Sequence, residues 1–530
     1  MKKVFLFLSL ILFFLSVQAQ RPSYGGKLKP EQENMDIRFY DIHLKVNIPQ
    51  KEIEGYTIIK CLLKKEAPII LLDLMDSLKV NGVLVNGKKV DFQHENNLLT
   101  LHKAVNFPSG IHMIKVLYSG HPMIAIRPPW DDGFTFTQDS SGHPWVAITA
   151  EGTGGKIFYP AKDHPSDEPD EGARLSITVP KDLVVPGPGI LKSRKVKGDW
   201  VSYTWETHYP INNYSILFNI GDYVLVERTY TTILGNKVPM QFYVLREHQA
   251  QAAHLLELME KAAHIKEKYL GEYPWAKEKI GLVETPHLGM EHQTMNAYGN
   301  KFRYTKKGGE DFDWLMNHEF GHEWWGNKVT AGDWADEWIH EGIETFCDHL
   351  YTLDTEGEES YENLFRQSVF QIKNDKPLVI GKDITEDEAY HPDIYPKGGF
   401  FMHTLRYVLG DSVFFPALKG FVTDPRFTYN HTTNTRDLMD YFNQRSGRNL
   451  DPLFQLYIYS IDKLEIEVIE KSSHQYSIRF KNLNMDLPLD IRTEKGISRI
   501  LVNQKGVLID SKIMPIIDEK GFYLKRLIYE

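Results

Sequence analysis

Hydrophobic and polar residues alternate with a period of two through much of the amino-terminal part of the chain. The segment His43–Ile48 shows the pattern clearly, as a half-buried strand does. Asn81–Gly82 and Asn86–Gly87 fall between apolar runs and predict tight hairpin turns. From Asp36 to about Val226 the chain therefore predicts an antiparallel β saddle or sandwich.

Helical periodicity replaces this alternation in the middle of the chain. Glu247–Leu270 predicts a long amphipathic helix whose apolar side chains form a core. The period of two returns after Lys463, in Leu464–Val468 and Tyr476–Phe480. We expect a multidomain α+β protein with an amino-terminal antiparallel β domain over 20–226, a mostly helical domain over 227–460 and a small β-sandwich-like domain over 461–530.

Composition narrows the class of protein. A length of 530 residues allows two to four domains with ample core. The apolar content of 42% and charged content of 25% are ordinary for a globular protein. A net charge of -10 argues against a nucleic-acid partner, which would favour a basic surface. The two cysteines, Cys61 and Cys347, are expected to be buried thiols in different domains rather than a disulfide.

The amino end resembles a secretory signal peptide. Lys2 and Lys3 precede an apolar run over Val4–Leu15, and small residues at Val17 and Ala19 suit a signal peptidase. The run is short for a transmembrane helix. We expect cleavage after Ala19, so that residues 1–19 are removed, no stable membrane insertion follows, and the protein is periplasmic, cell-surface or extracellular.

A His-Glu-x-x-His motif carries the clearest chemistry. His318 and His322 are four residues apart, so on a helix both imidazoles lie on one face and can bind one metal ion. Glu319 stays beside them as a carboxylate able to handle protons. Eighteen residues separate His322 from Glu341, with a plausible helix stop at Gly326–Asn327 between them.

Two helices joined by a short turn pack antiparallel, so Glu341 can face the histidine pair. Two imidazoles and one carboxylate leave the fourth tetrahedral position of a zinc ion open, which is typical of a catalytic site. Glu344 follows one turn after Glu341. It is expected either to hydrogen-bond the far nitrogen of a ligand histidine or to be a surface carboxylate.

The motif, its spacing and the run Trp338–Gly342 resemble the zinc aminopeptidases related to aminopeptidase N and leukotriene hydrolase, a branch of the gluzincin metallopeptidases. Trp325–Thr330 is similar to the family's run after the second histidine. The resemblance implies a thermolysin-like fold for the helical domain and one zinc ion held by His318, His322 and Glu341. It also implies that Glu319 is the general base.

Other parts of the chain resemble the family's substrate-binding residues. His287–Thr294 is similar to the family's Gly-x-Met-Glu-Asn strand, which implies that Gly289 and Met290 edge the cleft and that Glu291 binds the substrate's α-amino group. Leu288 and His292 depart from this pattern. Glu151 stands where the family has an acid or amide that reaches the active site, nine residues before Pro160. Tyr395, in Tyr-Pro-Lys-Gly, takes the place of the tyrosine that stabilises the oxyanion.

Two carboxylates at the amino end of a substrate have a clear physical purpose. A free amino terminus is an ammonium ion at neutral pH, and burying it without partners is very unfavourable. Glu151 and Glu291 can pair with it from two sides. An internal peptide segment offers no ammonium and leaves these charges unpaired, which disfavours endopeptidase cleavage.

The sequence thus predicts an exported zinc aminopeptidase acting on peptides with a free amino terminus. Two alternatives remain at this point: a zinc endopeptidase or other hydrolase on the same scaffold, and a non-catalytic binding protein. Neither the preferred first residue nor the oligomeric state follows from the sequence.

Overall fold

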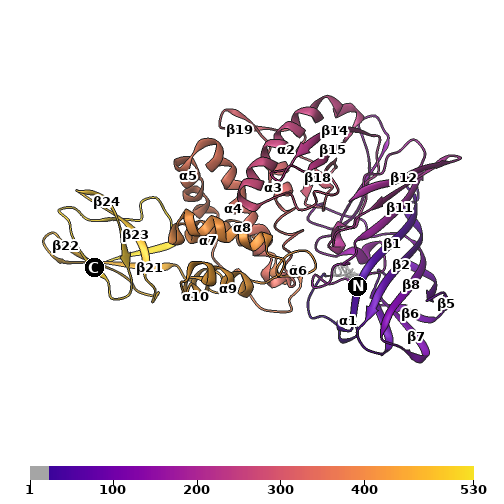
Figure 1. Ribbon diagram of the computed structural model, residues 1–530, viewed down its shortest axis with the longest axis horizontal. Helices are drawn as coiled ribbons and strands as arrows, with labels where there is room; N and C mark the ends of the chain where they lie inside the picture. Colours follow the sequence, from indigo (N-terminus) through magenta and orange to yellow (C-terminus); the bar gives the residue numbers. More distant parts are fainter. Residues whose placement is uncertain (1–22) are drawn as a thin grey trace, which may run out of the picture.

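The computed structural model describes residues 23–530 and shows three regions in chain order. A β-rich amino-terminal region and a small carboxyl-terminal β region lie at opposite ends, with the helices between them (Figure 1). This arrangement confirms the predicted multidomain α+β class. The predicted signal peptide, residues 1–19, lies outside the described residues. Within 23–530, no helix has both the length and the apolar character needed to cross a membrane.

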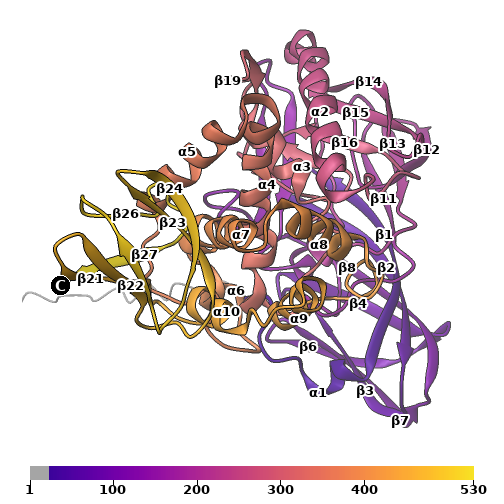
Figure 2. The same cartoon turned by 60° about the vertical axis from the view of Figure 1, so that its left-hand side comes forward.

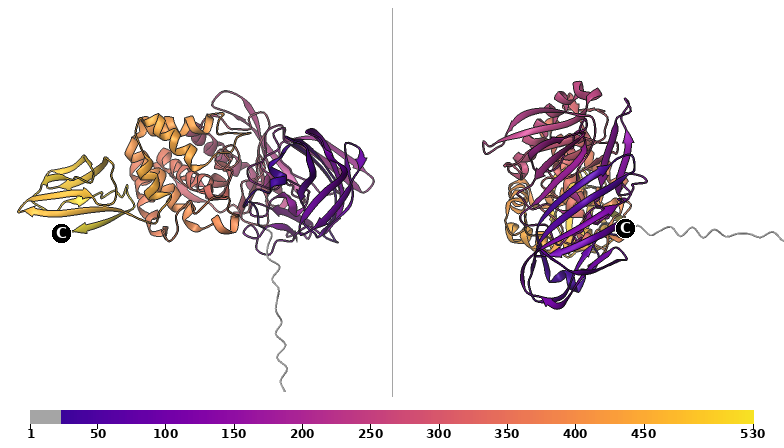
Figure 3. Two further views of the ribbon diagram at one scale, coloured as in Figure 1. Left: turned by 90° about the horizontal axis from the view of Figure 1, so that it is seen from below. Right: turned by 90° about the vertical axis from the view of Figure 1, so that its right-hand side faces the viewer.

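An eight-stranded sheet forms much of the amino-terminal region and faces the viewer in the right-hand view of Figure 3. Its order is β12-β13-β11-β1-β2-β8-β4-β5. Buried and partly buried residues alternate along much of β1, as the hydrophobic period predicts. Strands β1 and β11 pair in parallel, whereas all other neighbouring strands of this sheet are antiparallel. The strands are β1 (Met35–Asn47), β2 (Glu52–Leu63), β4 (Leu78–Val85), β5 (Lys88–Lys89), β8 (Gly110–Gly120), β11 (Ala173–Pro180), β12 (Ile190–Lys197) and β13 (Trp200–Glu206).

Two smaller sheets complete this region. They are β3-β7-β6 and β10-β9. The strands are β3 (Ala67–Asp73), β6 (Asp91–Glu95), β7 (Leu98–Phe107), β9 (Gly133–Gln138) and β10 (Pro144–Thr149), with the short helix α1 (Pro30–Glu33) packed near β3 and β1.

One of the two predicted hairpin turns is confirmed and the other is wrong. Asn86 and Gly87 connect β4 to β5 with φ values of 51° and 77°, the left-handed pair that a type I′ turn requires. Asn81–Gly82 instead lies inside β4, where the pairing with β8 shifts register between Val80 and Gly82. A bulge accommodates these residues without reversing the chain.

A five-stranded sheet in the order β14-β15-β16-β18-β17 opens the next region. The two-residue strand β17 lies at its edge and is antiparallel to β18. The predicted boundary at residue 226 falls inside β14. The strands are β14 (Tyr223–Thr231), β15 (Lys237–Leu245), β16 (Ile280–Glu284), β17 (Gly289–Met290) and β18 (Asn296–Tyr298). A short hairpin of β19 (Thr305–Lys307) and β20 (Glu310–Phe312) follows.

Helices make up the rest of this region (Figure 2). The predicted amphipathic helix is α2 (Gln249–Leu270), and it buries Leu255, Leu256, Met259 and Ala262. The other helices are α3 (Trp314–Gly321), α4 (Trp338–Glu356), α5 (Glu358–Ser368), α6 (Glu386–Ala389), α7 (Pro396–Leu409), α8 (Asp411–Thr423), α9 (Thr435–Ser446) and α10 (Asp451–Tyr457).

The carboxyl-terminal region consists of two small sheets in the orders β25-β22-β21-β27 and β24-β23-β26. Its apolar residues share one continuous core with the helices, whereas the amino-terminal sheet has a core of its own. Cys347 belongs to the first core and Cys61 to the second, and both are free and buried, as predicted. The strands are β21 (Leu464–Ser472), β22 (Gln475–Phe480), β23 (Leu487–Thr493), β24 (Gly496–Val502), β25 (Val507–Asp510), β26 (Ile516–Ile517) and β27 (Lys525–Tyr529).

Helices α3 and α4 are joined by a tightly bonded connection. The side chain of Asp313 accepts from Met316 N at 3.0 Å and caps the start of α3. Regular helix ends at Gly321, earlier than the stop predicted at Gly326–Asn327, because the following residues fold back on themselves. Asn327 N donates to His322 O at 3.0 Å in this turn.

Glu323 anchors this turn to the rest of the region. It has no solvent exposure. Its carboxylate accepts from Trp275 Nε1 at 2.6 Å, from Thr294 N at 2.9 Å and from Asn327 Nδ2 at 3.2 Å. One buried carboxyl group thus ties the end of α3 to the segment after α2 and to the loop that leads into β18.

We expect Glu323→Leu to lower the free energy of unfolding by about 3 kcal/mol or more, because several buried donors lose their acceptor together. Urea unfolding followed by tryptophan fluorescence measures the change. The exposed Glu359 on α5 provides a control, and Glu359→Leu should change stability by about 0.5 kcal/mol or less. Equal unfolding midpoints for the two variants would contradict the anchoring role.

Candidate active site

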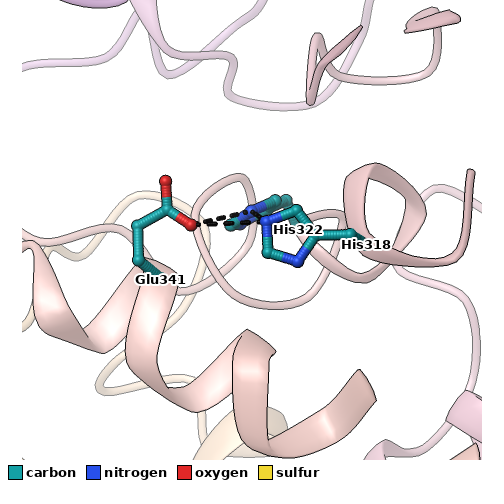
Figure 4. Close-up of side chains that lie close together, drawn as sticks. All are labelled: His318, His322 and Glu341. Carbon is teal, nitrogen blue, oxygen red and sulfur yellow. Dashed lines mark hydrogen bonds and ion pairs between the residues drawn. The ribbon is translucent and has the colours of Figure 1, made fainter. Parts of the chain in front are cut away.

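His318, His322 and Glu341 meet at one point between α3 and α4 (Figure 4). The two Nε2 atoms are 3.3 Å apart, and Glu341 Oε2 lies 3.5 Å from His318 Nε2 and 3.4 Å from His322 Nε2. Ligand atoms at about 2.0–2.1 Å from a tetrahedral zinc ion are about 3.3–3.4 Å from one another. The spacing of these three atoms therefore fits a zinc ion.

The chemistry of the donor set agrees with this fit. Glu341 Oε2 is buried and receives no hydrogen bond from any residue in 23–530. An anionic oxygen in that position needs a cation nearby. Two imidazoles and one carboxylate are borderline ligands that zinc prefers.

Hydrogen bonds behind the imidazoles fix their tautomers. His318 Nδ1 donates to Asp348 Oδ2 at 2.8 Å, and His322 Nδ1 donates to Trp325 O at 2.8 Å. Both Nε2 atoms are therefore left with a lone pair for a metal.

Asp348 is a functional residue that sequence reasoning missed. It lies two helical turns after Glu341 on α4. This spacing puts both side chains on the same face of the helix, so it could have predicted the position of Asp348. Glu344 does not make the contact proposed for it. It is fully buried, rather than a surface carboxylate, and pairs with Lys266 of α2, while Asp348 accepts from the ligand histidine.

Glu319 faces the edge strand β17 and lines the cleft. A Cβ atom on Gly289 would lie 2.5 Å from Glu319 Oε1 and 2.7 Å from Leu315 Cδ1. A side chain at 289 would displace Glu319 and Leu315, so glycine lets β17 approach α3 without moving the carboxylate of Glu319.

The two predicted amine-binding acids lie beside the metal ligands. Glu151 and Glu291 line the same cleft of about 380 Å³ as His318, His322 and Glu341. Tyr214 donates its hydroxyl to Glu291 Oε1 at 2.7 Å. Burial, and then the charge of Glu291, raises the pKa of Glu151. Two acids held this close favour a cation between them.

Glu337 is a third acid at this end of the cleft, and the sequence analysis did not single it out. One carboxylate oxygen from each of Glu151, Glu337 and Glu341 lies within 4.8 Å of the others. Ala331 N donates to His340 Nε2 at 2.8 Å, so the proton of His340 is on Nδ1, which points to Glu337 Oε1 at 3.1 Å. Glu337 lies one helical turn before Glu341, and this spacing could have predicted that it faces the same site.

Tyr395 lies at the start of α7 and donates its hydroxyl to Glu341 Oε1 at 2.7 Å. Burial, together with the charge of Glu341, raises the pKa of Tyr395 well above its usual value, so the hydroxyl stays protonated. The hydroxyl of Tyr390 is hydrogen-bonded to that of Tyr395. Because the hydroxyl proton of Tyr395 is donated to Glu341, Tyr390 must be the donor in the hydrogen bond between the two tyrosines. The sequence analysis did not identify Tyr390.

All the predicted site residues thus surround one cleft, including Met290 at the strand edge. Of the two departures from the family pattern, Leu288 also lines the cleft. His292 points inward and is 1% exposed, and neither ring nitrogen has a hydrogen-bond partner among the described residues. Within 23–530, the residues that line the cleft include no lysine or arginine.

Comparison with known proteins agrees with the geometry. Residues 254–457 match the peptidase family M1 domain. The chain is 21% identical over 529 residues to a leucyl aminopeptidase of Saccharolobus solfataricus, a match that covers 92% of this chain and 63% of that protein. It is 25% identical over 271 residues to aminopeptidase N of Escherichia coli, which covers 47% of this chain and 31% of that protein.

A solved structure supports the fold. An M1 zinc metallopeptidase variant from Deinococcus radiodurans, bound to a Tyr-Ser-Ala substrate, is similar with a TM-score of 0.69 at 21% identity, covering 82% of this chain and 95% of that chain. This chain spans 63% or less of the length of the two aminopeptidases named above. The matched residues 254–457 contain His318, His322 and Glu341, so the helical region that carries the predicted zinc ligands is similar to the peptidase family M1 domain.

Proposed function

We propose that this protein is a zinc-dependent aminopeptidase that hydrolyses the first peptide bond of peptides with a free amino terminus. One observation carries the proposal: Glu151 and Glu291 line the same cleft as His318, His322 and Glu341. A cleft with this many acids and no lysine or arginine in its described lining favours a cationic group. The peptide bound to the Deinococcus radiodurans relative is consistent with a peptide substrate.

Glu151 and Glu291 bind the substrate's ammonium group and so fix which bond is cut. One carboxylate oxygen of Glu151 lies within 4.8 Å of one of Glu341, so an ammonium group bound there would bring the first carbonyl close to the metal ligands. Tyr214 holds Glu291 by the hydrogen bond at 2.7 Å, so the carboxylate is already oriented before substrate binds. The strand edge at Gly289 and Met290 lies alongside the substrate.

His318, His322 and Glu341 would hold a zinc ion, which when bound would supply Lewis acidity to the carbonyl and to the attacking water. Glu319 takes a proton from the attacking water and later gives one to the leaving amine. With substrate bound, Tyr395 donates its hydroxyl to the carbonyl oxygen in place of Glu341 Oε1, as negative charge develops there. Tyr390 donates to Tyr395 and keeps that hydroxyl oriented.

We further propose that the protein is exported, because the amino-terminal pattern is typical of a signal peptide cut after Ala19. Export places it in the periplasm, on the cell surface or outside the cell.

His318→Ala should abolish stoichiometric zinc binding, because two remaining ligands hold zinc weakly. We expect about one zinc per chain in the purified wild type and far less in the variant after dialysis, measured by plasma mass spectrometry. Removing zinc from the wild type with a chelator should abolish hydrolysis, and adding zinc should restore it. Full activity in the chelated, metal-free protein would exclude a metallopeptidase.

Glu319→Gln should keep the zinc and lose turnover. The amide preserves shape but accepts no proton, and positioned acid–base groups contribute about 100- to 10,000-fold to the rate. We expect kcat to fall by about that factor on an aminoacyl fluorogenic amide, while zinc content stays unchanged. A zinc-loaded variant with wild-type kcat would refute the assignment of Glu319 as the base.

Acetylating the substrate's amino terminus should abolish cleavage, because the acetyl group removes the cation that Glu151 and Glu291 bind. Replacing either acid by glutamine should lower kcat/KM for the free amine by about 100-fold, as expected for one partner of a buried charge pair. A panel of matched free and acetylated aminoacyl amides measures both effects. Equal cleavage of the two forms would indicate the endopeptidase alternative, and absence of any hydrolysis by the zinc-loaded protein would indicate a binding protein.

A further inference from the structure

Lys266 and Glu344 form a buried ion pair behind the metal ligands. Lys266 lies on α2 and Glu344 on α4, and their side chains are 3% and 0% exposed. The ammonium of Lys266 donates to Glu344 Oε1. No step proposed for the reaction uses either residue, so the pair needs a separate explanation.

Gly321 shows how closely Glu344 approaches α3. A Cβ atom on Gly321 would lie 1.8 Å from Glu344 Oε1 and 2.0 Å from its carboxyl carbon. Gly321 stands immediately before His322, within the metal-binding motif. The carboxylate of Glu344 therefore lies directly against the backbone that carries one ligand, and Lys266 holds it there.

Glu344 also lies next to the residue that orients His318. One ring nitrogen of His318 and one oxygen each from Glu344 and Asp348 lie within 4.8 Å of one another. Two carboxylates this close repel each other, and the ammonium of Lys266 offsets that repulsion. Without Lys266, Asp348 and Glu344 would separate, and the hydrogen bond from His318 Nδ1 to Asp348 would be disturbed.

We propose that Lys266 and Glu344 are positioning residues of the metal centre. The pair sets the distance between α3 and α4, and thereby holds Glu341 Oε2 at 3.4–3.5 Å from the two imidazole nitrogens. Stability alone does not require an ion pair here, because well-packed apolar residues of similar volume are often as stabilising or more so. The inference rests on the proposed zinc site, and its consequence is tighter zinc binding.

The primary test measures the zinc Kd of the full-length protein by competition with a chromophoric chelator. We expect Glu344→Gln and Lys266→Met each to raise the Kd by about 10- to 100-fold, the usual effect of losing a residue that supports a ligand. The structure offers a matched control between the same two helices, the ion pair of Lys268 and Asp354, in which Lys268 is 58% exposed. Lys268→Met and Asp354→Asn should leave the zinc Kd unchanged.

A second variant separates positioning from folding. Replacing both partners together, as Lys266→Met with Glu344→Met, leaves no unpaired buried charge, so the protein should fold with an unfolding temperature equal to or above that of the wild type. We nevertheless expect its zinc Kd to be raised by about 10-fold or more. The visible absorption bands of the cobalt-substituted protein should shift as well, because they report the ligand geometry and not the overall stability.

A double-mutant cycle tests the contact with α3. Gly321→Ala should weaken zinc binding by about 10-fold or more in the wild-type background, because the new methyl group displaces the carboxylate of Glu344. In a Glu344→Ala background the same substitution should have little further effect, since the space is then free.

The inference is overturned if the folded Met/Met variant binds zinc within twofold of the wild type, or if the effects of Gly321→Ala and Glu344→Ala on the zinc Kd are additive. Either result would leave the proposed function intact, because wild-type zinc binding and hydrolysis are measured separately. If the wild type itself binds no zinc, the proposed function fails first.

Discussion

The distance between α3 and α4 governs the chemistry of this protein. Each helix carries part of the ligand set, and neither part binds an ion alone. Three atoms from α3, its carboxyl end and α4 lie 3.3–3.5 Å from one another. The hydrogen bonds of the buried Glu323 carboxylate and the close approach of Glu344 to Gly321 both fix the part of the chain that carries His322.

Charge explains why the cleft is built from acids. Glu151, Glu291, Glu319, Glu337 and Glu341 gather in a partly or fully buried space, where like charges repel one another. Such an arrangement is stable when cations enter it. In the proposed function, a divalent metal ion would compensate one end of the cleft and the ammonium ion of a substrate the other. Selectivity for the end of a peptide would then follow from electrostatics that exists before any substrate arrives.

Much of the fold and site could be predicted from the sequence, because both depend on local periodicity. The period of two in β1, the helical spacing in α2 and the four-residue interval between His318 and His322 each depend on short-range geometry. The resemblance to a known family supplied Glu151, Glu291 and Tyr395. The structure brings all of them to one cleft.

What the sequence could not predict depends on contacts between distant segments. Asn81–Gly82 has the composition of a turn, but pairing with β8 holds it in a strand. Asp348 and Glu344 are both plausible partners for a ligand histidine from their helical spacing. The choice between them depends on Lys266, which comes from a different helix. Glu337 is part of the site through its approach to Glu151, which comes from the amino-terminal region, and Tyr390 through its hydrogen bond to Tyr395.

The continuous apolar core that joins the helices to the last two sheets bears on how this chain can be divided. A boundary near residue 460 is convenient in the primary structure, yet the side chains on either side of it pack together. Cutting there would expose apolar side chains of the helices to water. The carboxyl-terminal β region is therefore better regarded as part of one folded unit with the helical region than as a separable domain.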